Sequence, residues 1–303
     1  MNPATLLPAA LSVLLAPLFL GVINRTKAVF AGRAGRPLLQ TYIDLAKLAR
    51  KGAVYSRTTT WVFRLAPITA LAAGLVALLL LPLGGFPAPI SFPGDFVLLI
   101  LVLGTSRFLT VIGALDTGSS FEGMGASREA SVSALAEPVL FLCLAVAARE
   151  SGQSTLSGIV GGLTGADWQR AGPALVLLAT SLLAILLAEN SRIPVDDPNT
   201  HLELTMIHEV MVLDHGGPDL ALILSGAALK LWILAALLVG LILPGRSGSP
   251  WLDSLLFSAG MLVLGVVIGI VESTIARLRL NRVPQFLVGA GAFAVMALAL
   301  IMR

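Results

Sequence analysis

Residues 217–243 read GPDLALILSGAALKLWILAALLVGLIL, and Asp219 and Lys230 are the only charged residues in this run. A helix needs about 20 predominantly apolar residues to cross the hydrocarbon core of a bilayer. Seven further runs of similar character occupy the rest of the chain, so we expect an all-α integral membrane protein, a single polytopic domain over residues 1–303. The eight predicted spans are 4–23, 61–82, 95–115, 130–149, 171–190, 217–243, 253–275 and 284–302.

The composition argues against several classes of function. The chain is 56% hydrophobic and only 12% charged, with a mean hydropathy of +0.92, whereas soluble domains carry about 25% charged residues. The net charge of +3 reflects membrane topology and does not indicate nucleic-acid binding. Cys143 is the only cysteine and lies inside an apolar run. One thiol cannot hold an iron–sulfur cluster, so we expect no cofactor on this chain and any redox centre on another chain.

The distribution of Lys and Arg predicts the orientation. The first span has no basic segment before it, so we expect a retained helix with its N-terminus outside rather than a signal peptide. With Arg64 included, the segments on the other side hold fourteen Lys and Arg against four on the outer side. Basic residues accumulate in cytoplasmic loops, and the predicted cytoplasmic segments are therefore 24–60, 116–129, 191–216 and 276–283.

The first of these segments contains AGRAGRPLLQTYIDLAKLARKGAVY (31–55). Leu38, Tyr42, Leu45 and Ala49 recur at helical spacing, which predicts an amphipathic helix on the membrane surface. Two interpretations stay open: a basic anchor that fixes topology, or a docking shelf for a soluble partner.

Residues 188–215, AENSRIPVDDPNTHLELTMIHEVMVLDH, hold six of the seventeen carboxylates and all three histidines. A zinc-protease helix would need a second histidine four residues after His208, and the next one is His215. His201 and His208 would lie ~10 Å apart along a helix, too far to share one ion, so we expect no metal site. Glu203 also fits a capping box with Thr200, and Asp197 before a proline fits a helix start.

Two opposite charges lie at matched depth inside predicted spans. Arg107 is nine residues from Asp116 at one helix end, and Glu137 is nine residues from Arg128 at another. At 1.5 Å per residue both are ~13 Å deep, where an isolated charge is costly, so we expect an ion pair. Either a structural ion pair or a proton path would explain why these two charges lie at matched depth. Lys230 is deeper still, with no partner in its own span.

Residues 114–138, ALDTGSSFEGMGASREASVSALAEP, contain three glycines, which predicts an irregular, tight turn between two spans. Glu129, Ser133 and Glu137 step at spacing four along one helix face, as a proton relay would need. Glu122 also has a plain explanation as the fourth residue of a capping box that starts at Ser119.

Three motifs resemble the membrane subunit that anchors the hydrogenase arm of group 4 nickel–iron hydrogenases of the formate hydrogenlyase type. They are AENSRIPVDDPNTHLELTMIHEVMVLDH (188–215), FEGMGASREASVSALAEP (121–138) and RPLLQTYIDLAKLARKG (36–52). That subunit is homologous to the quinone-site membrane subunit of respiratory complex I. The resemblance covers essentially the whole chain, including the number of spans.

The resemblance implies a membrane subunit that anchors a redox arm in the inner membrane of a prokaryote. Its partners would be a hydrogenase large subunit with a nickel–iron centre, a small subunit with iron–sulfur clusters, and antiporter-like membrane subunits. It implies a proton path through acidic residues, and the candidates are Asp116, Glu122, Glu129, Glu137, Glu189 and Glu203. Arg107 and Arg192 are the candidate ion-pair partners, with Arg192 expected to stabilise its acidic neighbours. The candidate docking residues are Asp196, Asp197, His201, His208, Glu209 and Asp214.

Three alternatives stay open. A quinone-binding subunit of a complex I type enzyme is one, although VDDPNTHLELTMIHEVM (195–211) departs from that branch after the Arg-x-Pro and favours the hydrogenase branch. An independent secondary transporter is another, although no matching pair of broken helices is visible in the two halves of the chain. A purely structural anchor is the third, but it would not need Glu137 inside the hydrocarbon.

Overall fold

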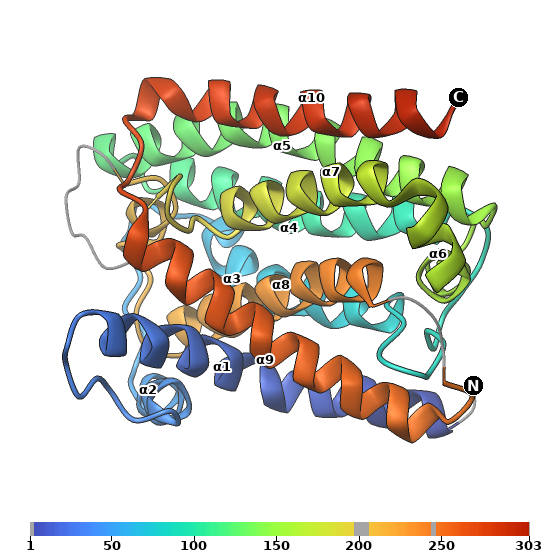
Figure 1. Cartoon of the computed structure of the whole chain (residues 1–303). Helices are drawn as coiled ribbons and strands as arrows, with labels where there is room; N and C mark the ends of the chain where they lie inside the picture. The colour runs from blue at the N-terminus through green and yellow to red at the C-terminus, as the bar shows by residue number, and fades with distance from the viewer. Residues whose placement is uncertain (1–2, 197–205, 244–246, 303) are drawn as a thin grey trace.

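The computed structural model describes residues 3–196, 206–243 and 247–302. Within these residues, eight helices are long and apolar enough to cross a membrane. They run side by side in alternating directions (Figure 1). They are α1 (Pro3–Phe30), α3 (Trp61–Leu79), α4 (Asp95–Asp116), α5 (Ser120–Ser151), α7 (Gly165–Glu189), α8 (Gly217–Ile242), α9 (Pro250–Thr274) and α10 (Val283–Ile301). The all-α membrane fold expected from the apolar runs is confirmed.

Within the described residues, four short elements lie between the long helices. They are α2 (Gln40–Ala49), α6 (Leu156–Gly162) and the 3-10 turns η1 (Glu209–Val212) and η2 (Leu280–Arg282). Figure 1 shows α2 end-on, so its axis is perpendicular to the long helices, as expected for a helix along the membrane plane. However, α2 is not an isolated surface helix, because it packs against α8 and α1.

The predicted turn over residues 116–129 is wrong in extent. Only Thr117 to Ser119 separate α4 from α5, and α5 begins at Ser120. Gly123 and Gly125 are helical, and a Cβ on Gly125 would lie only 2.2 Å from Val210 Cγ1. This glycine is therefore needed for the close approach of η1 to α5 rather than for a turn. As a result, Glu122 and Glu129 lie on a helix instead of a loop.

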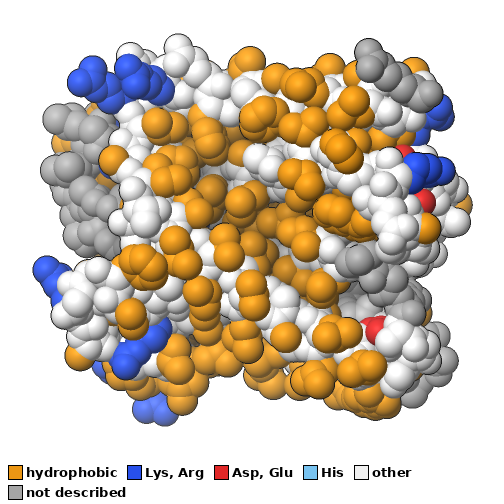
Figure 2. Space-filling model, viewed as in Figure 1, with side chains coloured by type: hydrophobic (Ala, Val, Ile, Leu, Met, Phe, Trp, Pro, Cys, Tyr) orange, Lys and Arg blue, Asp and Glu red, His pale blue; other side chains and the backbone are white. Residues whose placement is uncertain are grey.

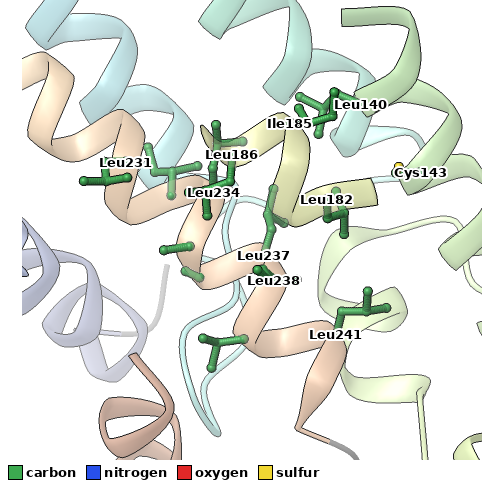
Figure 3. Close-up of a cluster of buried hydrophobic side chains, with 14 of the residues drawn as sticks. Leu140, Cys143, Leu182, Ile185, Leu186, Leu231, Leu234, Leu237, Leu238 and Leu241 are labelled. Carbon is green, nitrogen blue, oxygen red and sulfur yellow. The ribbon is translucent and has the colours of Figure 1, made fainter. Parts of the chain in front are cut away.

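The core is centred on α8, the most buried of the long helices. A helix that is hydrophobic on all sides is buried, and α8 contacts α1, α3, α7 and α9. Figure 3 shows leucines of α8, such as Leu234 and Leu237, meeting Leu186 and Leu182 of α7. Cys143 of α5 is buried beside the same cluster, as expected for a small hydrophobic side chain.

The outer surface is apolar where lipid would contact it. Figure 2 shows hydrophobic side chains over the middle of the molecule and charged side chains toward the two ends of the long helices. Exposed apolar residues such as Leu101, Val263 and Val288 lie on different long helices. This pattern is typical of a protein surrounded by hydrocarbon.

Candidate functional site

Arg107 of α4 is buried and lies against three carboxylates from two other helices. Its Nη2 is 2.5 Å from Glu189 Oε2 on α7, its Nη1 is 3.1 Å from Glu137 Oε1, and its Nε is 3.6 Å from Glu129 Oε1. The structure therefore brings together the Arg107 and Glu137 pair expected from matched depth. It also adds two further acids to the pair, both on the predicted proton path.

Lys230 completes this group from the opposite side. Its Nζ lies 2.8 Å from Glu189 Oε2, so Glu189 is held between two cations. The partner of Lys230 lies on another helix, so the sequence of the span that contains Lys230 could not identify it. We call Arg107, Glu129, Glu137, Glu189 and Lys230 the central charge cluster.

A cavity of about 320 Å³ borders the central charge cluster. Arg107, Glu129, Glu189 and Lys230 line its polar part, while Leu20, Leu45 and Leu224 are among its apolar lining residues. Helix α2 contributes to its wall with Thr41, Asp44 and Leu45. The amphipathic helix predicted from residues 38–49 therefore helps to enclose a chamber next to buried charges.

Glu137 is the member of the central charge cluster that does not line this cavity. Its side chain is 39% exposed, whereas the Glu129 and Glu189 side chains are 8% and 3% exposed. Glu137 lies beside Gly104 of α4, where a Cβ would lie 3.1 Å from its Oε1. The central charge cluster thus reaches from the cavity to the outer surface formed by α4 and α5.

A second charge cluster consists of Lys27, Arg192 and Glu272. The carboxylate of Glu272 is fully buried on α9 and lies 2.7 Å from Lys27 Nζ and 3.2 Å from Arg192 Nη1. Arg192 is in an ion pair, as expected, but the partner is Glu272 of α9 rather than an acidic neighbour in its own segment. Glu272 could have been noticed as an acidic residue inside a predicted span, since such residues are rare and usually paired.

The segment after α7 is fixed by a further set of contacts. Asp196 is buried and accepts a hydrogen bond from Ile207 N at 2.9 Å, while Arg277 Nη2 lies 2.7 Å from its other oxygen. Its carboxylate therefore ties the chain together inside the subunit, so a direct docking contact is not supported. Asp214 is exposed and remains on the surface.

Glu122 binds this same segment from α5. Its Oε1 accepts a hydrogen bond from Asp214 N at 3.0 Å, and the Ser119 side chain makes no cap to α5. The capping-box interpretation of Ser119 and Glu122 is therefore wrong. Asp116 accepts hydrogen bonds from Thr60 N and Thr60 Oγ1 and so ties α4 to the start of α3. The described contacts do not connect it to Arg107.

One of the two described histidines lies at the cavity. His208 and Glu209 line it, and burial together with the Lys230 cation lowers the pKa of His208 to about 4. His215 is buried and stacks on Phe63 with ring centroids 3.8 Å apart, and burial lowers its pKa as well. Burial therefore favours the neutral form of both imidazoles. Asp197, His201 and Glu203 lie outside the described residues, as do the capping patterns expected around them.

Comparison with known proteins identifies the family. The sequence profile described as NADH dehydrogenase matches residues 4–302 of this chain. The chain belongs to the NADH dehydrogenase family. This confirms the relationship to the membrane subunits of complex I and related complexes that the three motifs indicated.

Two relatives in this family come from Escherichia coli strain K12. Formate hydrogenlyase subunit 4 is 30% identical over 304 residues, covering 96% of each chain. Hydrogenase-4 component C is 34% identical over 275 residues, covering 89% of this chain and 86% of the relative. The fold also matches a chain of the membrane-bound sulfane sulfur reductase, an archaeal respiratory membrane complex, with a TM-score of 0.76 and 22% identity over 97% of this chain and 99% of that one.

Metal binding is not supported by the geometry of the site. Within the described residues, no three side chains of His, Cys, Asp or Glu are grouped so that they could hold a metal ion. In this NADH dehydrogenase family member, the acids of the two charge clusters are instead paired with Arg and Lys. The chemistry that the arrangement supports is charge compensation and proton exchange.

Proposed function

We propose that this chain is the membrane anchor subunit of a hydrogenase complex of the formate hydrogenlyase type. We also propose that its central charge cluster transfers protons. A hydrogenase large subunit and a small subunit would dock on the basic end, with the nickel–iron centre and the iron–sulfur clusters on those partners. Antiporter-like membrane subunits would lie alongside. The full-length similarity to hydrogenase subunits supports this proposal.

The single observation that carries the proton role is the composition of the central charge cluster. Three carboxylates face two cations, so the cluster can hold one proton while its charges stay balanced. Glu189 is held by two cations at short distance, whereas Glu129 is 3.6 Å from Arg107. Glu129 is therefore the acid that is best placed to take up a proton from the cavity, and Glu137 is the acid that reaches the outer surface.

Substitution of the two acids tests this role in the intact complex. Neither Glu129→Gln nor Glu137→Gln strands Arg107, because each leaves it two of its three carboxylates. We therefore expect assembly and hydrogen evolution from a reduced viologen to persist in both variants. Proton movement across vesicle membranes, measured with a pH-sensitive dye during turnover, should fall at least tenfold.

Glu150→Gln is the matched control, because Glu150 lies at the far end of α5 and pairs with Arg170. It should leave both hydrogen evolution and proton movement unchanged. Normal proton movement in Glu129→Gln and Glu137→Gln would show that the central charge cluster has only a structural role. Loss of assembly in Glu137→Gln would lead to the same conclusion.

The docking part of the proposal concerns the face around residues 206–216. Leu213 is 52% exposed next to exposed Asp214, at the basic end of the molecule. Leu213→Lys should release the soluble arm while the membrane chain stays inserted. Gln169→Lys adds the same charge at an exposed position at the opposite end and should leave the arm bound. Equal retention of the arm in both variants, measured by co-purification, would place the docking face elsewhere.

The proposed location is the inner membrane of a prokaryote, with the N-terminus outside. Support comes from the excess of Lys and Arg on the side that carries α2 and η1. A cysteine-labelling experiment tests this orientation. Ser56→Cys should react with a membrane-impermeant maleimide only in inverted vesicles, whereas Ser151→Cys should react only in right-side-out ones.

One observation favours a second candidate function, quinone binding. The cavity combines apolar lining residues with polar groups such as His208 and Lys230, and sites for small ligands are of this mixed kind. A photoreactive short-chain quinone should then label the cavity saturably in the intact complex. Labelling that does not saturate would leave the hydrogenase anchor as the function.

A further inference from the structure

A second hollow, of about 540 Å³, opens where α1 and α9 end. Its walls come from the last turns of α1, from residues 31–36 and from Ser273 of α9. The side chains that define its chemistry are Asn24, Lys27, Phe30, Arg33, Arg36 and Ser273. None of the described residues that line it is acidic, so the hollow is strongly positive.

The positive charge of this hollow is only partly compensated. Lys27 is paired with Glu272 at 2.7 Å, but Arg33 and Arg36 make no ion pair with any other described residue. Both arginines are exposed. An anion in the hollow would therefore meet two guanidinium groups, a neighbouring ammonium group and the side chains of Asn24 and Ser273.

The backbone holds the two arginines in place. Helix α1 ends in a Schellman motif, with Gly32 N donating to Val29 O and Arg33 N donating to Ala28 O. Gly32 has a φ of +65°, which suits glycine at this position. Arg25 Nη1 donates to Ala34 O and draws the loop back against the helix. The loop is thus built against α1 and presents Arg33 and Arg36 beside the end of α9.

Phe30 lines the hollow, and further exposed apolar side chains lie close in sequence to the lining residues. Val29, Phe30, Leu38 and Leu39 are each between 45% and 65% exposed, and Ile275 follows the end of α9 at 47%. The site lies at the ends of two membrane-spanning helices, the level at which lipid headgroups lie. A ligand with an anionic head and apolar chains would satisfy both the arginines and these side chains.

We propose that this hollow binds the phosphate-bearing headgroup of an anionic phospholipid. Basic pockets between membrane helices bind such headgroups, and each Lys or Arg near the surface contributes about 1 kcal/mol, a factor of about five in affinity. The site is distinct from the central charge cluster and does not depend on the function proposed above. It would fix the end of α1 and the loop before α2 at the membrane surface.

The test uses the full chain purified in a non-ionic detergent and titrated with phosphatidylglycerol, with bound lipid measured by native mass spectrometry. Arg33→Gln with Arg36→Gln should weaken binding about 30-fold. Arg33→Lys with Arg36→Lys should restore most of it. The matched control is Arg50→Gln with Lys51→Gln, which removes the same charge from exposed residues after α2 and should bind as the original chain does. Phosphatidylcholine should not bind at the same concentrations.

Two further experiments test whether the ligand is a lipid or free phosphate, and where the lipid binds. A large excess of inorganic phosphate should leave phosphatidylglycerol bound, and displacement by phosphate would overturn the lipid assignment. A phosphatidylglycerol with a photoreactive acyl chain should label residues 24–40 of the unaltered chain, so the proposal stays testable if the arginine variants do not fold. Labelling elsewhere, or equal weakening in the control variant, would also overturn the proposal.

Discussion

Lys230 Nζ and Arg107 Nη2 lie 2.8 Å and 2.5 Å from the same oxygen atom, Oε2 of Glu189. Three helices, α4, α7 and α8, therefore meet at one carboxylate atom. Removing one partner of a buried ion pair costs about 3–5 kcal/mol, because the other charge remains in a low-dielectric interior. Glu189 is in this sense the junction of the helix bundle.

The first prediction concerns Lys230. Lys230→Met should lower the free energy of unfolding by about 3 kcal/mol, the lower end of that range, because Arg107 still faces Glu189. The measurement is thermal unfolding in detergent. Arg50→Gln, which removes a charge from an exposed residue after α2, should leave the melting temperature unchanged. Similar melting temperatures for both variants would show that the Lys230 contact is not stabilising.

The second prediction concerns the second charge cluster. Glu272→Gln leaves Lys27 and Arg192 without their shared carboxylate, so we expect a loss of about 3–5 kcal/mol of stability. The local consequence should be faster hydrogen exchange in residues 190–196, which Arg192 connects to α9. Unchanged exchange there would mean that Arg192 does not position this segment.

The third prediction uses a pair of glycines on α5. Gly125→Ala would place a methyl group 2.2 Å from Val210 Cγ1 and 3.0 Å from Ile207 O, so it should displace η1. We expect a loss of about 1–3 kcal/mol, as for other overpacked sites. A Cβ at position 123 would have no neighbouring atom within 4 Å, so Gly123→Ala should stabilise α5 by about 0.5–1 kcal/mol. Limited proteolysis within 206–216 should increase only in Gly125→Ala.

The fourth prediction concerns pH. Burial and the neighbouring Lys230 lower the pKa of His208 to about 4, below the value of about 6.5 for a free imidazole. The unfolded chain therefore binds more protons than the folded chain between pH 6.5 and 4. The stability that neutral His208 permits is complete above pH 6.5 and is lost as the pH falls through this window, by at most roughly 1.4 kcal/mol per pH unit.

His208→Asn tests the contribution of this group. The difference in unfolding free energy between the original chain and the variant should depend on pH between 6.5 and 4 and be constant above pH 7. Burial also lowers the pKa of His215, so the variant should keep part of the acid sensitivity. A difference that does not change with pH would show that His208 is accessible to water and titrates normally.

The amino-acid sequence by itself determined the features that depend on local composition. The eight spans follow from the length of the apolar runs, and α2 follows from the spacing of Leu38, Tyr42 and Leu45. The pairing of Arg107 with Glu137 could be predicted because helix rise fixes the depth of each residue. Depth, length and amphipathicity are properties of one segment, so one segment is enough to predict them.

The tertiary structure decided which charges meet. Depth does not give the direction in which a side chain points, so neither the pairing of Lys230 with Glu189 nor that of Arg192 with Glu272 could be predicted. The role of Gly125 likewise depends on η1, which comes from a segment about 85 residues away. Partners in a helix bundle are chosen by rotation and packing between helices, and only the folded arrangement specifies these.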